Sequence, residues 1–257
     1  SNREPYVHRR SRHGVEVERP PGGLVAALDP VMQALGGVWI AWGSGNADRE
    51  AVDEHDRVAV PPERPRYTLR RVWLPEPVVE NYYYGFANQA LWPLCHMAVD
   101  KARFRRRYWD GYVAANARFA AAVLQEAALG ALVWLHDYHL ALAPRQIRQQ
   151  RGDLVLAHFW HIPWPAWDVF RACPAAQRRA LLDGLLGCDL LGFHLERFRQ
   201  TFLECVAREL EAHVDADRGT VDYRGHRTTV EAFPISIDVE RFDRLARSPA
   251  AQQWMAR

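Results

Sequence analysis

The sequence lacks several features that would mark a secreted, disulfide-bonded or membrane-spanning protein. Its first twenty residues are rich in Arg, Glu and His with no apolar run, and no stretch approaches the roughly 18 apolar residues of a membrane helix. Cysteine is scarce and never in a CxxC spacing; the four residues are Cys95, Cys173, Cys188 and Cys205. Because each lies in or beside an apolar segment, we expect reduced core thiols and a cytoplasmic location.

A strong charge imbalance and several common catalytic motifs are also missing. The 33 Lys and Arg residues against 31 Asp and Glu residues leave a formal net charge of +2, which argues against nucleic acid or an anionic membrane as the main partner. No GxSxG, GxxxxGK[ST] or GxGxxG pattern occurs, which lowers the case for hydrolases, ATPases and dehydrogenases. Tryptophan, by contrast, is abundant at ten residues, and its flat face suits sugar rings as well as protein cores.

The stretch 131–165 predicts a strand, a short helix and a second strand. Two apolar runs of strand length each end in a histidine-rich polar cluster, and Pro144 opens a helical segment between them. In an open parallel sheet, ligands collect beyond the carboxyl ends of the strands. We therefore expect a crevice there, lined by His136, Asp137, His139 and His161.

Helices and strands alternate around this unit. Further strands are expected at 36–42, 57–60, 67–74 and 188–193, and helices from residue 24 and at 112–127, 174–186 and 196–210. Asn116 falls on the apolar face of the helix at 112–127, where its amide must find a hydrogen-bond partner. Alternating runs around Arg224-Gly225 predict a β-hairpin at 221–233. The pattern predicts an α/β, Rossmann-like fold with a mostly parallel sheet flanked by helices.

Three segments leave alternatives open. Residues 9–21 are charged and irregular, which predicts a mobile loop. Residues 81–96 are dense in aromatic side chains without clean periodicity, which suits a hydrophobic cluster beneath a loop or a sugar-binding wall. The pair Gly22-Gly23 precedes a helix, where free amides favour a phosphate, although two such glycines more often form only a turn.

The histidine clusters invite a zinc site, but strand geometry argues against one. Imidazole is a good zinc ligand, yet residues three apart in a strand point to opposite faces, so His158 and His161 would not converge. We expect no metal site, and a buried, hydrogen-bonded role for His158. Asp137 suits either the orientation of a substrate hydroxyl or the capping of the following turn, and the local pattern does not decide between them.

Several motifs together resemble those of a known enzyme family. In chain order they read SNREP, PPGGL, GGVWIAW, YYYGFANQALWPLCH, WLHDYHLALAP, FWHIPWP, CDLLGF and FPISID. Their order and approximate spacing resemble the trehalose-6-phosphate synthase family of retaining glycosyltransferases. The resemblance implies a GT-B fold, in which two Rossmann-like domains face each other across a cleft. It implies that residues 1–257 form the single N-terminal, acceptor-side domain, that the C-terminal nucleotide-sugar domain lies outside the chain, and that the chain alone should not turn over.

The same resemblance implies roles for residues of the acceptor site. Arg3 matches the family arginine that binds the acceptor's phosphate, a contact that suits the guanidinium fork. Asp137 matches the carboxylate that orients the acceptor hydroxyl. The aromatic residues of the glucose 6-phosphate pocket are matched by Trp39, Tyr83 and Trp92.

For the donor, the resemblance implies a phosphate-binding loop and one histidine. Gly22 and Gly23 match the loop whose backbone amides contact the donor diphosphate, and His161 matches the histidine near the transferred glucosyl unit. The family has no generally assigned enzymic nucleophile, and the departing phosphate is thought to assist same-face attack. The protein then supplies positioning and charge stabilisation, with no cofactor and no metal. The remaining histidines are expected to be scaffold.

The function expected from the resemblance is glucosyl transfer from a nucleotide-glucose to glucose 6-phosphate, giving trehalose 6-phosphate. Expected partners are this donor, this acceptor and the C-terminal domain, with no nucleic acid or membrane, and with a homo-oligomer left open. Another phosphorylated acceptor, such as glycerol 3-phosphate, is an alternative, and a non-catalytic sugar-phosphate-binding module is a second. The acceptor is open because the chain departs from the common family pattern at Glu4, Pro20, Pro21, Tyr84, Trp160 and Trp164.

Overall fold

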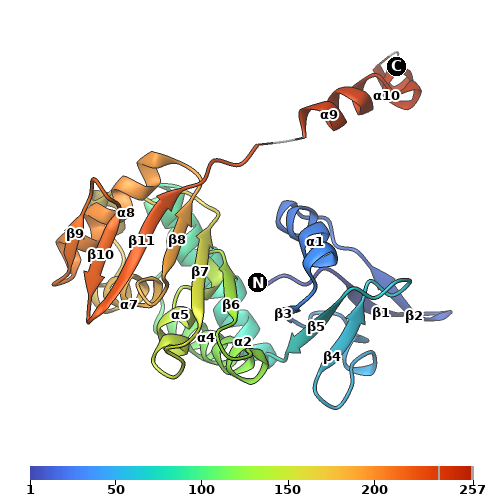
Figure 1. The fold of residues 1–257 in the computed structure, drawn as a ribbon, viewed down its shortest axis with the longest axis horizontal. Helices are drawn as coiled ribbons and strands as arrows, with labels where there is room; N and C mark the ends of the chain where they lie inside the picture. Colours follow the sequence, from blue (N-terminus) through green and yellow to red (C-terminus); the bar gives the residue numbers. More distant parts are fainter. Residues whose placement is uncertain (237, 256–257) are drawn as a thin grey trace.

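The fold is built around a mostly parallel sheet (Figure 1). The computed structural model describes residues 1–236 and 238–255, and within these residues the sheet has six strands. In order across the sheet they are β6 (Leu132–His136), β7 (Val155–Trp160), β8 (Leu190–Phe193), β11 (His226–Ala232), β10 (Thr220–Tyr223) and β9 (His213–Asp215). The first four run parallel, while β10 is antiparallel to both its neighbours. The predicted α/β class is therefore confirmed.

The predicted β-hairpin near the C-terminus is also confirmed. Strands β10 and β11 pair around Arg224 and Gly225, which both have positive φ, at 51° and 74°. Two central turn residues with positive φ give a turn whose twist matches that of the flanking strands, and glycine adopts this conformation without strain.

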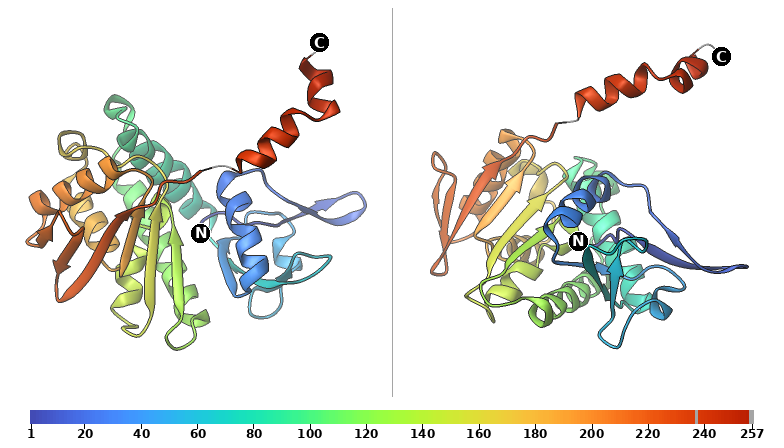
Figure 2. Two further views of the ribbon diagram at one scale, coloured as in Figure 1. Left: turned by 45° about the horizontal axis from the view of Figure 1, so that its top comes forward. Right: turned by 45° about the vertical axis from the view of Figure 1, so that its right-hand side comes forward.

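A smaller sheet lies beside the larger one in the described part of the chain (Figure 2). Its strands, in order, are β3 (Val38–Trp42), β5 (Tyr67–Val72) and β4 (Arg57–Val60). Strand β5 pairs parallel with β3 and antiparallel with β4. Helix α1 (Gly23–Leu35) covers this sheet by packing Val25, Leu28 and Met32 against its apolar side chains.

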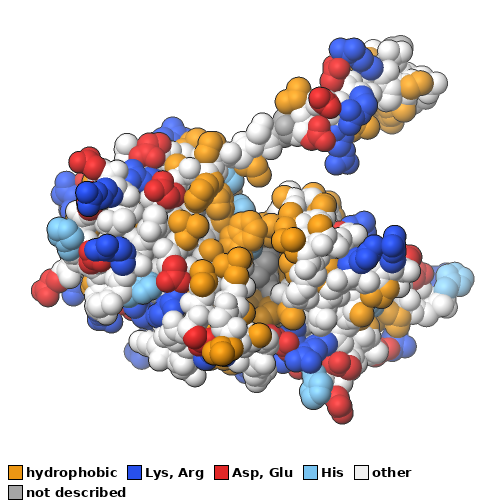
Figure 3. Space-filling view, viewed as in Figure 1, with side chains coloured by type: hydrophobic (Ala, Val, Ile, Leu, Met, Phe, Trp, Pro, Cys, Tyr) orange, Lys and Arg blue, Asp and Glu red, His pale blue; other side chains and the backbone are white. Residues whose placement is uncertain are grey.

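Strands β3 and β6 belong to different sheets and border an open apolar groove. A cavity of about 320 Å³ lies between them, lined by Val38 and Ile40 of β3 and by Leu132 and Trp134 of β6. Leu132 is 68% exposed. Figure 3 shows apolar side chains gathered in the hollow between the two parts of the molecule. The amino group of Ser1 donates a hydrogen bond to Ile40 O (3.1 Å), so the chain begins alongside β3.

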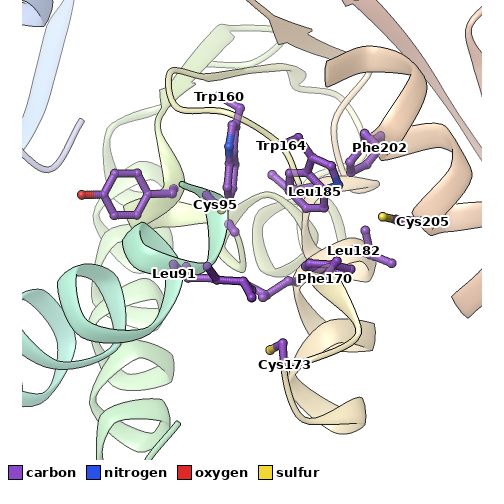
Figure 4. Packing of buried hydrophobic residues seen from close by; sticks show 14 of the residues in the cluster. Leu91, Cys95, Trp160, Trp164, Phe170, Cys173, Leu182, Leu185, Phe202 and Cys205 are labelled. Carbon is purple, nitrogen blue, oxygen red and sulfur yellow. The ribbon is translucent and has the colours of Figure 1, made fainter. Parts of the chain in front are cut away.

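A row of helices covers one face of the large sheet. Its members contact one another in the order α4 (Arg106–Glu126), α5 (Ala143–Arg148), α7 (Ala175–Leu185) and α8 (Glu196–Glu209), and α6 (Trp167–Phe170) packs against α8. The core beneath them is rich in aromatic rings, and Trp164 packs at 4.9 Å from both Trp160 and Phe202 (Figure 4). The four cysteines are buried and free, as the sequence predicts.

The N-terminal charged segment is an ordered hairpin, so the predicted mobile loop is wrong. Strands β1 (Val7–Ser11) and β2 (Gly14–Glu18) pair antiparallel along their whole length. In β2, valine alternates with glutamate, the period of a strand. The many charges of this segment concealed that alternation, because both faces of the hairpin carry arginine or glutamate.

The aromatic stretch 81–96 forms one continuous helix instead of a loop. It begins as α2 (Glu76–Val79), continues as the π-helical segment η2 (Glu80–Leu91) and ends as α3 (Trp92–Cys95). A π-helix makes i→i+5 hydrogen bonds and is wider than an α-helix. Because its apolar residues do not repeat at 3.6, the stretch shows no α-helical periodicity in the sequence.

Short elements and a projecting C-terminal arm complete the described chain. The single-turn 3-10 helices are η1 (Asp48–Glu50), η3 (Val99–Lys101) and η4 (Tyr138–Leu140). Helices α9 (Val239–Ala246) and α10 (Pro249–Met255) extend away from the body in Figures 1 and 2. Among the helices described, none combines the length and apolarity that crossing a membrane needs.

Candidate functional site

The carboxyl ends of β6, β7 and β8 lie level with one another. His136 is in register with Phe159, and Trp160 with Phe193. The residues that follow these strands therefore emerge at one edge of the sheet. The backbone N–H of Asp137 donates to Phe159 O at 2.7 Å, which fixes the first of these residues to the neighbouring strand.

The two carboxylate oxygens of Asp137 differ in their contacts: Oδ1 is hydrogen-bonded within the protein, and Oδ2 is not. Its Oδ1 accepts hydrogen bonds from the backbone N–H groups of Tyr138 (2.9 Å) and His161 (3.3 Å), so it caps η4. Its Oδ2 lies 3.8 Å from Nδ1 of His139, beyond hydrogen-bond distance. The capping role and a substrate-facing role are thus compatible, because they use different oxygens.

The backbone and the ionisation of Asp137 are both unusual. Its φ of 72° lies in the region that residues other than glycine rarely adopt, a conformation that clusters at functional sites. Burial raises the pKa of its carboxyl to about 6, because removal from water disfavours the charged form. The backbone hydrogen bonds from Tyr138 and His161 act in the opposite direction but do not cancel this effect.

The histidines at these strand ends are buried or, for His161, half-buried, and burial lowers their pKa values. Burial lowers the pKa of His158 to about 3, and its Nε2 lies 3.2 Å from Asp137 O, as expected for a hydrogen-bonded core residue. Nδ1 of His136 lies 3.1 Å from Nε2 of His161, and burial lowers the pKa of His161 to about 4. Within residues 1–236 and 238–255, no group of three or more His, Cys, Asp or Glu side chains is arranged to hold a metal ion.

Arg3 and Tyr83 form the polar and aromatic centre of the site. The guanidinium of Arg3 donates to the hydroxyl of Tyr83 at 2.7 Å. Tyr83 stacks on His139, with 5.6 Å between ring centroids and 15° between planes, which ties η2 to the turn after β6. Trp92 stacks on His96 at 4.0 Å and remains 45% exposed, so one of its faces is available to a ligand.

The glycine pair begins α1 and leaves open space above it. Gly22 is the residue before the helix, and Ala26 N–H is the first amide to bond back to its carbonyl. A Cβ added to Gly22 or Gly23 would meet no atom within 4 Å, Gly22 is extended with a φ of 175°, and neither residue adopts the left-handed conformation that favours glycine. Nothing within the described chain therefore requires glycine here, and the open space leaves the backbone at the start of α1 accessible.

Six of the eight residues predicted for the site share one cavity, which we call the strand-end cavity. It has a volume of about 320 Å³. The predicted residues that line it are Arg3, Gly22, Gly23, Tyr83, Trp92 and Asp137. His136, Tyr138 and His139 also line it, which agrees with the strand pattern that placed these two histidines at the crevice, whereas after the family resemblance they were expected to be scaffold.

The other two predicted residues lie outside the cavity lining. Trp39 is 5% exposed, stacks on Tyr67 at 6.3 Å and donates from its indole nitrogen to Arg3 O at 3.0 Å. It supports Arg3 from behind. The ring of His161 packs against His136 and His194, while its backbone N–H reaches Asp137.

A second cavity, the hairpin cavity, adjoins the first. It measures about 330 Å³ and shares Arg3 and Tyr83 with the strand-end cavity. Trp42 and Tyr84 supply further aromatic walls, with Trp42 at 5.9 Å and Tyr84 at 5.1 Å from the Tyr83 ring. Alternation along β3 could have revealed Trp42, because it lies three residues after the buried Trp39 and therefore on the opposite face.

Comparison with known proteins gives one consistent result. The model of the family described as "Glycosyltransferase family 20" matches residues 1–257. A trehalose-6-phosphate synthase of Mycolicibacterium vanbaalenii is 41% identical over 263 residues, covering 98% of this chain and 52% of that protein. The chain thus spans about half the length of the curated relatives that it matches.

Solved structures agree with this result. An E. coli structure bound with UDP-2-fluoro glucose superimposes with a TM-score of 0.78 and 29% identity, covering 94% of this chain and 52% of the other. A UDP-forming synthase from Burkholderia xenovorans in complex with glucose-6-phosphate gives a TM-score of 0.77 and 26% identity, covering 92% and 52%.

Proposed function

Because this chain belongs to glycosyltransferase family 20, we propose that it supplies the acceptor half of a glucosyl-transfer site. The reaction moves glucose from a nucleotide-glucose to glucose 6-phosphate and gives trehalose 6-phosphate. The observation that carries the proposal is the placement of Arg3 and Asp137 in one cavity, with Tyr83 and Trp92 as its aromatic walls. A phosphorylated sugar needs these three features: a cation, flat apolar faces and a carboxylate acceptor.

The acceptor would lie with its phosphate towards Arg3 and its reacting hydroxyl towards Asp137. Oδ2 of Asp137 accepts a hydrogen bond from that hydroxyl, because Oδ1 is already occupied by two backbone N–H groups. With a pKa of about 6, the carboxyl is mostly ionised at neutral pH and can act as an acceptor. Trp39 keeps Arg3 in place through its hydrogen bond to the Arg3 carbonyl.

The donor diphosphate would meet Gly22 and Gly23, whose amides are free at the start of α1. In the transfer, the bond between glucosyl C1 and the phosphate oxygen breaks and a bond from C1 to the acceptor oxygen forms. The hydroxyl proton passes to the departing phosphate. The protein's contribution is to position the acceptor and stabilise charge. In this proposal His161, whose backbone N–H donates to Asp137 Oδ1, would lie near the transferred sugar.

The test joins this chain to the C-terminal half of the Mycolicibacterium vanbaalenii relative and measures trehalose 6-phosphate formation. Asp137→Asn should lower the rate about 100-fold or more, because the neutral amide orients the hydroxyl poorly, while glucose 6-phosphate still binds. Asp153→Asn is the control, because Asp153 is an exposed residue of the same β-α-β unit paired with Arg151. Failure to form trehalose 6-phosphate from any common nucleotide-glucose would remove the acceptor assignment.

A further inference from the structure

The hairpin cavity carries a cation from the β1–β2 hairpin in addition to Arg3. Arg9 of β1 lines it, together with the aromatic rings of Trp42, Tyr83 and Tyr84. Arg3 and Tyr83 line both cavities and so stand between the hairpin cavity and the strand-end cavity. A ligand held by Arg3 is therefore in contact with a space that Arg9 also borders.

Strand alternation directs Arg9 towards this cavity and its neighbours away from it. Val7 and Arg9 are two residues apart on β1 and both line the cavity. His8 is buried on the other face, with its Nδ1 3.3 Å from Asp48. Arg10, also on that face, forms an ion pair with Glu50. The pairing of the hairpin thus fixes the face of β1 on which Arg9 lies.

The other arginines near this space are committed to buried carboxylates. Arg71 is fully buried between Glu4 and Asp48, and Arg19 is paired with the buried Asp29. Glu4 borders the hairpin cavity, but its carboxylate is occupied by Arg71 and by the N–H and hydroxyl of Ser44. Of the described residues that line the hairpin cavity, Arg3 and Arg9 are the cations.

The present partner of Arg9 holds it weakly. Nε of Arg9 lies 2.5 Å from Oε2 of Glu18, and both side chains are about half exposed. Exposed ion pairs of this kind contribute only about 0–1 kcal/mol. A phosphate dianion offers two charges and several acceptor oxygens, so it competes well with Glu18 for the guanidinium of a residue that already lines the cavity.

We propose that Arg9 is a second phosphate-binding residue of the acceptor site, acting with Arg3 on the phosphoryl group of the sugar phosphate. This inference rests on the proposed function, because it assumes that the acceptor is phosphorylated. Through Arg9, the β1–β2 hairpin would favour the binding of phosphorylated over unphosphorylated sugars. The two arginines approach the group from separate elements, the N-terminal segment and β1.

The experiment titrates the ¹⁵N-labelled chain with glucose 6-phosphate and with glucose and follows amide shifts by NMR, which detects millimolar affinity. Arg9→Gln should weaken glucose 6-phosphate binding about 10-fold, as the loss of one charged hydrogen-bonding partner predicts, and leave glucose binding unchanged. Arg10→Gln is the matched control on the same strand and should remain within about twofold of the parent. Thermal unfolding of each variant shows whether the hairpin is intact.

Three results would overturn the inference, and they differ in their consequence for the proposed function. If Arg9→Gln binds glucose 6-phosphate like the parent while Arg3→Ala does not bind it, the inference is wrong and the proposed function stands. If the parent chain shows no shift with glucose 6-phosphate, Arg3 and Arg9 do not form a phosphate site in this half and the inference falls, whereas the acceptor assignment is decided by trehalose 6-phosphate formation in the joined enzyme. If Arg9→Gln weakens glucose and glucose 6-phosphate equally, Arg9 supports the fold of the cavity and does not bind phosphate.

Discussion

At the scale of single residues, Arg71 shows how a charge can be buried to hold the site in place. It is fully buried in β5, where it contacts the carboxylates of Glu4 and Asp48 and donates to Tyr6 O at 2.8 Å. Burial lowers its pKa to about 9, but it remains charged at neutral pH. Because Glu4 follows Arg3 directly, this ion-pair cluster fixes the backbone from which Arg3 reaches the cavity.

Arg71→Met should therefore be strongly destabilising. The substitution leaves two buried carboxylates without their cation, and breaking a buried pair in this way costs about 3–5 kcal/mol of the free energy of unfolding. Urea unfolding monitored by tryptophan fluorescence measures it. Arg227→Met is the control, because Arg227 forms an exposed pair with Asp222 and should lose less than about 1 kcal/mol. Similar losses for the two variants would contradict the assignment of the cluster.

At the scale of elements, α4 ties the turn after β6 to the rest of the fold through Asn116. Its amide donates to Tyr112 O (2.9 Å) and His139 O (3.1 Å), and its oxygen accepts from the N–H groups of Leu142 (3.0 Å) and Ala143 (3.1 Å). One fully buried side chain thus bonds to four backbone groups: one in α4, one in η4 and two just after η4. The turn that follows Asp137 is thus fixed to α4.

We predict that Asn116→Leu lowers the free energy of unfolding by about 2–4 kcal/mol, although leucine has a similar volume. Loss of the Asn116 amide leaves the carbonyl of His139 and the N–H groups of Leu142 and Ala143 buried without partners, and each such group costs about 1–3 kcal/mol. Arg118→Ala, on the exposed face of the same helix, should change stability by less than about 0.5 kcal/mol. Equal melting temperatures for Asn116→Leu and the parent would refute this role.

The elements differ in how well the sequence predicted them, for physical reasons. The helix at 112–127 and the strands at 131 and 155 were predictable because their apolar residues repeat at 3.6 or run continuously. The π-helical segment η2 was not, since its wider turn breaks that repeat. The β1–β2 hairpin was missed because charge on both faces hides alternation, and Arg9 was missed with it. Tertiary placement, such as that of Trp39 behind Arg3, depends on contacts that no local pattern encodes.

At the scale of the whole molecule, the strand ends concentrate histidines that the fold holds neutral. Besides His158 and His161, burial lowers the pKa of His136 to about 2 and that of His139 to about 3. These side chains come from the edge strand β6, its neighbour β7 and the turns that follow them, and they contact one another and the aromatic rings of the site. Their ionisation is therefore linked to the folding of the entire sheet and not to one loop.

Stability should fall steeply below pH 6.5. The four histidines have folded-state pKa values of about 2 to 4, below the value of 6.5 for the unfolded chain, so their contribution is complete above pH 6.5 and is lost as the pH falls towards 4. Asp137 acts in the opposite direction, since its raised pKa of about 6 favours the folded state as it takes up a proton, but it is one group against four. Urea unfolding at pH 7.5 and pH 5 should differ by on the order of 5 kcal/mol, with the lower value at pH 5. His158→Asn should weaken the dependence of stability on pH. His55→Asn, at an exposed position, should leave it unchanged. Equal stability of the parent at the two pH values would contradict the neutral burial of these histidines.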